Sequence, residues 1–168
     1  RHREEHAIPV IGATGSNGNT VVQEWLYQLL PPTLHVTRSP KSYNSQVGVP
    51  LSVCLLGEHS EIGIFEAGIS QPGEMAALRA IIQPTIGVMT NIGPAHQENF
   101  ESVEEKCHEK LSLFQDAKVL VYCADDAVVD ECVAASLLRG ERLAWSRRNP
   151  SAALFVSAVE TLECGTRI

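Results

Sequence analysis

A loop rich in glycine and small polar residues follows a short apolar run near the start of the chain. The loop consists of Gly15, Ser16, Asn17, Gly18, Asn19 and Thr20. Glycines let the backbone curl so that successive N–H groups point at phosphate oxygens, and the start of a following helix adds partial positive charge. Thr20 stands where the hydroxyl of a phosphate loop would ligate Mg²⁺. The segment therefore predicts a site for the phosphates of a nucleotide.

The lysine of the usual phosphate loop is missing, and Asn19 stands in its place. The outer glycine of the generic motif is also replaced, by Ala13. An ammonium group is a point charge aimed at the transferring phosphate. Loss of one such transition-state contact typically costs on the order of 100- to 1,000-fold in rate. We therefore expect impaired ATP turnover. Taken alone, the loop fits an ordinary turn between a strand and a helix equally well.

Three polar residues follow apolar runs that are expected to be strands. Glu66 ends the run 61–66, and Asn91 and His96 follow the run 85–90. The carboxyl ends of parallel strands meet at one edge of a sheet, where ligands bind. Mg²⁺ prefers carboxylate oxygen, and Asn91 could hydrogen-bond a phosphate or a water molecule. The alternatives are an exposed carboxylate at Glu66, a surface or packed histidine at His96, and a simple turn residue at Asn91.

A charged helix is expected at residues 103–114, with Lys106 and Lys110 on one face. Glu105 and Glu109 lie at spacings that favour ion pairs with lysines along such a helix. Either lysine could reach a phosphate site, and the alternative is a solvated run of charges.

Strands alternate with helices along most of the chain. Strands are expected at 7–12, 33–40, 61–66, 85–90, 118–123, 142–145 and 154–159, and helices at 20–30, 73–82, 103–114 and 127–138. The stretch 45–56 fits either a helix or a strand, and 165–168 resembles the start of a strand with no partner after it. This alternation predicts an α/β fold, a mostly parallel sheet with helices on both faces.

The composition limits the classes of partner. Hydrophobic residues make up 44 % and charged residues 20 % of the 168 residues, which suits a soluble core. The net charge of −7 argues against nucleic acid and anionic membranes, and no apolar run reaches the roughly 20 residues of a membrane span. The five cysteines include no CxxC pair, so we expect most of them to be buried thiols in the reducing cytoplasm.

Five blocks in order resemble the Mur ligase family, namely 10–30, 42–51, 65–68, 90–96 and 106–114. They are similar to that family's TGxNGKTT loop, its NxxxGxPL segment, its ExG and TNIGxAH motifs, and the helix that carries its lysine. The family's loop also usually lacks the outer glycine. Within the family, residues 24–26 and 38–44 are most similar to members that act on D-alanyl-D-alanine, in particular the Bacteroidetes form fused to an alanine racemase.

The resemblance implies ATP-dependent amide bond formation. A carboxylate of a UDP-N-acetylmuramoyl-tripeptide would attack the γ-phosphate to give an acyl phosphate, and D-alanyl-D-alanine would then displace phosphate. The loop and Asn91 would bind ATP, and Thr20 and Glu66 would hold a first Mg²⁺. His96 would help to hold a second, with Lys110 carbamylated as an oxygen ligand. Lys110, His96 and Glu66 are thus the expected catalytic residues. Lys110 is preferred to Lys106 because its spacing to Phe114 matches the family.

The resemblance also implies that residues 1–168 are the central ATP-binding domain of a longer enzyme. A UDP-sugar domain would precede it and a C-terminal ligase domain would follow it, and the chain alone would be inactive. One alternative is a non-catalytic phosphate-loop-like module with a structural or interaction role, which Asn19 favours. Another is a relative of folylpolyglutamate synthases, which fits the stretch 44–51 less well.

Overall fold

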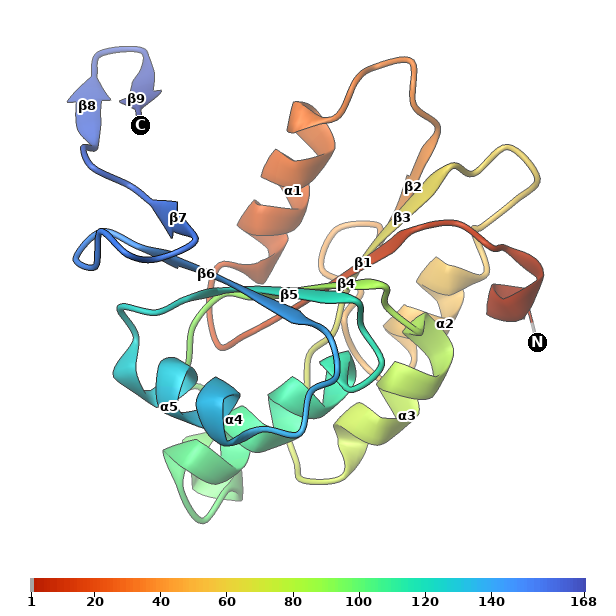
Figure 1. Cartoon of the computed structure of the whole chain (residues 1–168). Helices are drawn as coiled ribbons and strands as arrows, with labels where there is room; N and C mark the ends of the chain where they lie inside the picture. The colour runs from red at the N-terminus through yellow and green to blue at the C-terminus, as the bar shows by residue number, and fades with distance from the viewer. Residues whose placement is uncertain (1) are drawn as a thin grey trace.

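A seven-stranded sheet, parallel throughout, runs through the centre of the chain (Figure 1). A computed structural model describes residues 2–168, and Arg1 lies outside the described residues. The strands are β1 (Val10–Thr14), β2 (Val36–Arg38), β3 (Ile62–Glu66), β4 (Ile86–Met89), β5 (Val119–Cys123), β6 (Glu141–Ser146) and β7 (Leu154–Phe155). Their order is β2-β3-β1-β4-β5-β6-β7, so β1 lies between β3 and β4.

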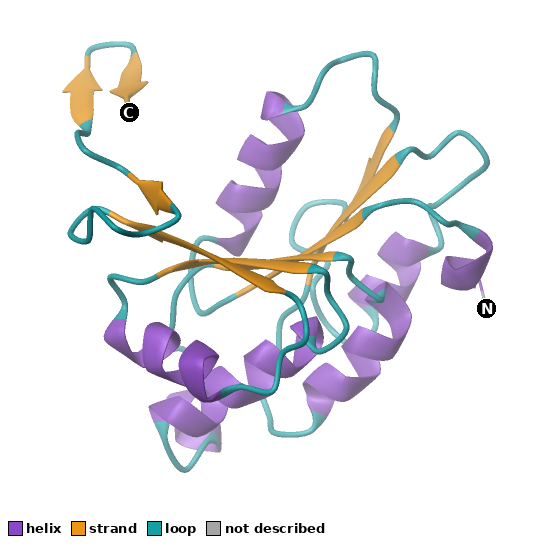
Figure 2. Ribbon diagram, in the orientation of Figure 1, coloured by secondary structure: helices purple, strands orange, loops and turns teal. Residues whose placement is uncertain are grey.

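Helices cover both faces of this sheet, which confirms the expected α/β fold (Figure 2). The α-helices are α1 (Asn19–Leu29), α2 (Gly48–Val53), α3 (Glu74–Ile82), α4 (Val103–Leu111) and α5 (Ala127–Ala135). Short 3₁₀ helices are η1 (His2–Glu5), η2 (Gln97–Asn99) and η3 (Ser112–Phe114). Helix α1 lies alone on one face, and α2 to α5 lie on the other (Figures 1 and 2).

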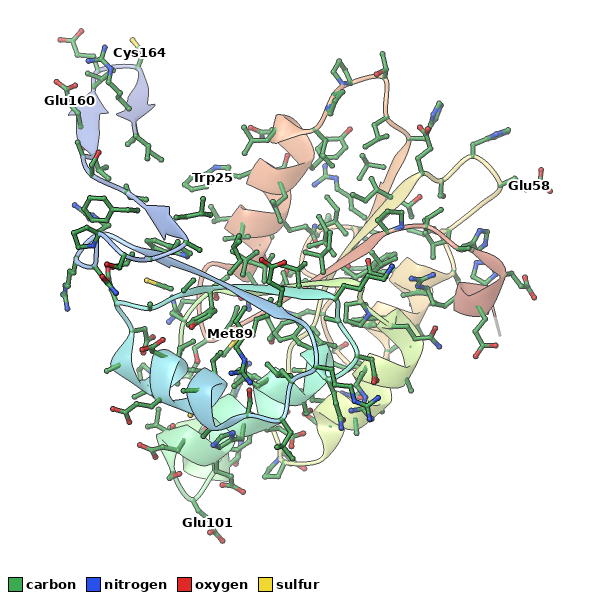
Figure 3. All side chains as sticks on the ribbon, viewed as in Figure 1. Trp25, Glu58, Met89, Glu101, Glu160 and Cys164 are labelled. Carbon is green, nitrogen blue, oxygen red and sulfur yellow. The ribbon has the colours of Figure 1, made fainter. Side chains whose placement is uncertain are left out.

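The burial of the strands follows from the unequal number of helices on the two faces of the sheet. All five residues of β1 are buried, because helices lie on both sides of it. In β5, buried residues alternate with partly exposed ones, since its helix-covered face holds Leu120 and Tyr122. The main hydrophobic core contains the side chains on that face together with others such as Leu78 and Phe114. On the outer side of α1, Trp25 remains 62 % exposed (Figure 3).

The ambiguous stretch 45–56 forms a helix, α2. Pro50 is the third residue of this helix. The first N–H groups of a helix have no partner within it, so a proline costs nothing there. The valines that favoured a strand, Val49 and Val53, are instead buried in the core.

Several expected boundaries were wrong. The first strand begins at Val10 rather than residue 7, and α5 ends at Ala135 rather than at residue 138. The strand expected at 154–159 is only β7, two residues long. The end of the chain does have a strand partner, but that partner precedes it. β9 (Gly165–Arg167) pairs antiparallel with β8 (Glu160–Leu162) in a short hairpin.

The cysteines only partly follow expectation. All five are free thiols, but Cys107 and Cys132 alone are buried. Cys54 is exposed at the end of the short α2, and Cys164 is exposed in the turn of the β8–β9 hairpin. The expectation that most would be buried was therefore wrong. Among residues 2–168, no helix is both long and apolar enough to cross a membrane.

Candidate functional site

The glycine-rich loop joins the carboxyl end of β1 to the start of α1, as expected. Gly18 precedes α1 in a left-handed conformation, with φ of 79°, which favours glycine. At Gly15, which has φ of 156°, an added Cβ would lie 1.9 Å from Oγ1 of Thr90. No side chain caps α1, so the first amides of the helix have no partner within it and can receive an anion.

Asn91 braces this loop from the end of the neighbouring strand. Its backbone carbonyl accepts a hydrogen bond from Ser16 N at 2.9 Å, and its side-chain oxygen accepts one from Asn17 N at 3.1 Å. The side chain expected to face a phosphate therefore holds the loop in shape. The amides of Ser16 and Asn17 are occupied, so the open donors lie at the start of α1, from Asn19 onward.

Glu66 is buried beneath the loop, which excludes the reading of an exposed carboxylate. It is 2 % exposed at the end of β3, and the pairing of Ala13 with Glu66 brings the ends of β1 and β3 together. The hydroxyl of Thr20 donates to Oε2 of Glu66 at 2.9 Å, and Nδ2 of Asn44 donates to Oε1 at 2.6 Å. Both carboxylate oxygens are thus oriented by neutral donors.

Asn44 was missed as a functional residue, although it lies in a segment that resembled the family. Its distance in sequence from Glu66 gave no sign of the contact. The pair Thr20–Glu66 offers oxygen ligands, which suit Mg²⁺. Within residues 2–168, no three His, Cys, Asp or Glu side chains form a group that could hold a metal.

Asn19 is held inside the loop. Its Nδ2 donates to the carbonyl of Gly15 at 3.0 Å, and its Oδ1 accepts from the hydroxyl of Thr90 at 2.9 Å. The side chain is 9 % exposed. The residue in the lysine position therefore stabilises the loop. Thr90 was also missed as a site residue, although it begins the segment 90–96 that resembles the family.

The lysines of α4 are buried, which excludes the solvated reading. Nζ of Lys110 donates to the carbonyl of Gly15 at 3.0 Å, and the residue is 4 % exposed. Burial, and then the neighbouring charge of Lys106, lowers the pKa of Lys110 to about 8. Nζ of Lys106 donates to the carbonyls of Gly93 and Ala95.

Glu109 on the same helix does not form the expected surface ion pair. Its Oε1 accepts hydrogen bonds from the amides of Gly73 at 2.9 Å and Met75 at 3.0 Å, at the start of α3. Glu105 likewise accepts from the amide of Glu101. These carboxylates therefore satisfy backbone donors, and Glu109 fastens α3 to the helix that carries Lys110.

His96 lines the same cavity as the loop. This cavity of about 420 Å³ is also lined by Gly15, Asn19, Glu74 and Lys110. His96 has φ of 56°, a left-handed conformation that turns the chain after the motif. The pKa of Glu74 is lowered, mainly by a hydrogen bond from the Ser70 amide and to a smaller extent by His96. Of the sequence-predicted residues, those that line this cavity are Gly15, Ser16, Asn19, His96 and Lys110. Thr20 and Glu66 are not among its lining residues, and they contact each other directly.

Comparison with known proteins gives a consistent match. The sequence profile of the Mur ligase middle domain matches residues 13–163. The UDP-N-acetylmuramoyl-tripeptide–D-alanyl-D-alanine ligase of Bacillus subtilis is 33 % identical over 129 residues, which cover 75 % of this chain and 28 % of that protein. The chain therefore spans less than a third of the length of this relative.

Two solved structures share the fold. MurF from Acinetobacter baumannii has a TM-score of 0.85 at 23 % identity, over 99 % of this chain and 39 % of that one. MurF from Thermotoga maritima, solved in complex with ADP, has a TM-score of 0.83 at 28 % identity, over 98 % of this chain and 39 % of that one. The likeness extends over the loop, the sheet and α4.

Proposed function

This chain belongs to the Mur ligase family as a middle domain, and from this premise we propose that it binds Mg²⁺-ATP for an amide-forming ligase. The ligase joins D-alanyl-D-alanine to a UDP-N-acetylmuramoyl-tripeptide in peptidoglycan synthesis, in the cytoplasm. The named Bacillus relative supports this substrate assignment, and the ADP complex of the Thermotoga structure supports the nucleotide. That this chain comes from the form of the ligase fused to an alanine racemase stays a prediction.

One observation carries the proposal: the Thr20–Glu66 contact beneath an uncapped helix start. A hydroxyl and a buried carboxylate at the edge of the sheet offer two oxygen ligands on the inner side of the loop. The first amides of α1 face the same region and carry partial positive charge. A nucleotide phosphate placed there meets backbone donors, while its metal meets Thr20 and Glu66.

Each residue then has a role. The open amides at the start of α1 donate to the phosphates, and Asn91 keeps the rest of the loop 15–20 in shape. Thr20 and Glu66 hold the first Mg²⁺, which neutralises phosphate charge when bound. His96, which lines the cavity, would help to hold a second Mg²⁺. A carbamate on Lys110 stays a prediction.

The other parts of the reaction lie with the rest of the ligase. The UDP-sugar substrate and D-alanyl-D-alanine bind to its other domains, so we expect no amide formation by residues 1–168 alone. In a longer protein that carries Asn19, we expect ligation to be slower than in its Asn19→Lys counterpart, by on the order of 100-fold. Equal rates would contradict this role of the missing lysine.

A second candidate function is a non-catalytic module with this fold. The observation in its favour is that Asn19 is bonded within the loop and offers no cation to a ligand. Against it stand the buried Glu66 and its orientation by Thr20 and Asn44, an arrangement that a purely structural loop does not need.

Calorimetric titration of ATP into the chain, with Mg²⁺ and with a chelator, tests the proposal. We expect ATP to bind, and to bind more tightly with Mg²⁺. Adenosine, which lacks phosphates, serves as the matched ligand and should show no dependence on Mg²⁺. Absence of ATP binding, or binding that ignores Mg²⁺, would support the non-catalytic module.

A further inference from the structure

A closed ring of hydrogen bonds ties the start of α1 to the ends of β2 and β3. The hydroxyl of Thr20 donates to the Glu66 carboxylate at 2.9 Å, and the backbone N–H of Glu66 donates to Oγ of Ser39 at 3.3 Å. Nε2 of Gln23 donates to the carbonyl of Ser39 at 3.0 Å. Gln23 and Thr20 lie about one turn apart on α1, so the ring closes through the helix itself.

Ser39 extends the pairing of β2 with β3 by one step. Arg38 is the last residue of β2 and pairs with Ile64. Ser39 follows it, and its N–H donates to the carbonyl of Ile64 at 3.0 Å. The N–H of Glu66 lies beyond the last residue pair of β2 and β3, and the Ser39 hydroxyl accepts it. The side chain of Ser39 therefore holds the backbone of Glu66 on its β2 side.

Gln23 is a costly residue to bury unless its contact with Ser39 matters. The side chain is 1 % exposed, on the inner side of α1. Its Nε2 is bonded to Ser39, but its Oε1 has no hydrogen-bond partner within residues 2–168. An unpaired buried acceptor destabilises a fold, so an apolar side chain of this size would serve packing as well or better. Packing alone therefore does not account for the glutamine.

The place of α1 on the sheet depends on contacts of this kind. Within residues 2–168, α1 has no neighbouring helix on its face of the sheet, and its outward residues Val21, Trp25 and Leu29 are exposed (Figures 1 and 2). Contacts on the inner side of the helix must therefore set its distance from the end of β3. That distance decides whether the hydroxyl of Thr20 reaches Glu66.

We propose that Gln23 and Ser39 are positioning residues for the metal site, which hold α1 and β3 so that Thr20 and Glu66 present their oxygens to one Mg²⁺. This inference rests on the proposed function of Mg²⁺-ATP binding. Neither Gln23 nor Ser39 lines the cavity beside the loop. They act through the backbone of Glu66 and the placement of α1, without touching the nucleotide.

Amide hydrogen exchange in the nucleotide-free chain tests the ring itself. Gln23→Met keeps the size of the side chain and removes the donor to Ser39. We expect the Glu66 amide to exchange about 10-fold faster relative to the Ala67 amide, which donates to the Ala13 carbonyl. The ratio of the two rates cancels any change in global stability. Gln28→Met, the same change on the exposed side of α1, should leave the ratio unchanged.

Calorimetric titration of ATP, with Mg²⁺ and with a chelator, tests the consequence for the metal site. We expect Gln23→Met and Ser39→Ala each to reduce the Mg²⁺-dependent gain in ATP affinity by at least about 5-fold. Affinity without Mg²⁺ should stay within about 2-fold, because the amides of α1 remain. The double variant should be no worse than the weaker single one, since a ring opened once gains little from a second cut. A merely structural role would lower the melting temperature and leave the Mg²⁺ gain intact.

The outcomes are distinct. An unchanged exchange ratio in Gln23→Met, or a Mg²⁺ gain equal to the parent's in both single variants, overturns the inference and leaves the proposed function standing. Losses that add in the double variant indicate two independent effects and also overturn it. If one single variant does not fold, the other decides the calorimetric test. If the parent binds ATP without any response to Mg²⁺, the proposed function fails and the inference fails with it.

Discussion

The hydroxyl of Thr20 lies 2.9 Å from Oε2 of Glu66, although 46 positions separate the two residues in sequence. Parallel pairing of β1 with β3 produces this contact, because it brings the ends of both strands to one edge of the sheet. The order β3-β1-β4 places the segment after β4, with Asn91 and His96, on the other side of the loop. The topology thus brings together these three segments of the candidate site.

Replacing Glu66 by glutamine tests its role as a metal ligand. The side chain keeps its shape and can still contact Thr20 and Asn44, so the fold should survive. An amide is a poorer ligand for Mg²⁺ than a carboxylate, so we expect the Mg²⁺-dependent gain in ATP affinity to be lost. The measurement is ATP titration with and without Mg²⁺, together with the melting temperature.

The matched control is Glu58→Gln, which makes the same change in an exposed loop (Figure 3). It should leave the Mg²⁺ response intact. A Glu66→Gln protein that is folded and still responds fully to Mg²⁺ would remove Glu66 from the metal site.

Lys110 should give the protein a distinct pH dependence. Burial lowers its pKa in the folded state from an ordinary value near 10.5 to about 8. Between these values the unfolded chain binds more protons than the folded one, so this residue makes the unfolding free energy rise with pH. The full rise is on the order of 3 kcal/mol.

Chemical denaturation of the parent and of Lys110→Met from pH 7 to pH 10.5 measures this effect. The difference between the two curves isolates Lys110, because other groups titrate in both proteins. We expect the parent to gain stability relative to the variant as pH rises above about 8. Parallel curves would mean that Lys110 is not held in a desolvated position.

Glu109 on α4 should stabilise the fold through its contact with the start of α3. Its carboxylate caps α3, because the residue before that helix is Gly73, which has no side chain to cap it. We expect Glu109→Ala to lower the unfolding free energy by about 1–2 kcal/mol, as for loss of other helix caps. The exposed Glu131 on α5 provides the control, and Glu131→Ala should change stability far less. Equal effects in urea denaturation would argue against the cap.

Gly15 should tolerate no side chain. An alanine Cβ there would lie 1.9 Å from Oγ1 of Thr90, and also within 3 Å of the backbone oxygen of Asn91. Either the loop or the segment after β4 must move, so we expect Gly15→Ala to destabilise the protein by about 1–3 kcal/mol. At Gly57 an added Cβ meets nothing within 4 Å, so Gly57→Ala is the matched control. Similar melting temperatures for the two variants would contradict the close approach.

Much of the fold could be predicted from local patterns. Strands β3, β4 and β5 are short apolar runs between turns, and α1 ends before Pro31 and Pro32. The predictions of secondary structure failed where contacts between distant parts of the chain determine it. Pro50 argued against a helix until its place in the first turn was known. The end of the chain had no visible partner because β8 is short and wholly exposed, without the alternation of a half-buried strand.

The residues of the candidate site could be singled out from the sequence, but their contacts could not. The loop, Glu66 and Lys110 could be singled out from motif and spacing. The burial of Lys106 and Lys110 could not, because a run of charges on a helix normally faces water. Asn44 and Thr90 act through partners that are distant in sequence, and only the paired strands bring them together.

The most direct test of the central claim is amide NMR of the ¹⁵N-labelled chain during titration with Mg²⁺-ATP. The account predicts the largest shifts at residues 15–20, with smaller ones near Glu66, His96 and Lys110, and much weaker changes with adenosine. Shifts confined to another part of the chain, such as the β8–β9 hairpin, or no shifts even at saturating nucleotide, would contradict the claim that this loop is a phosphate site.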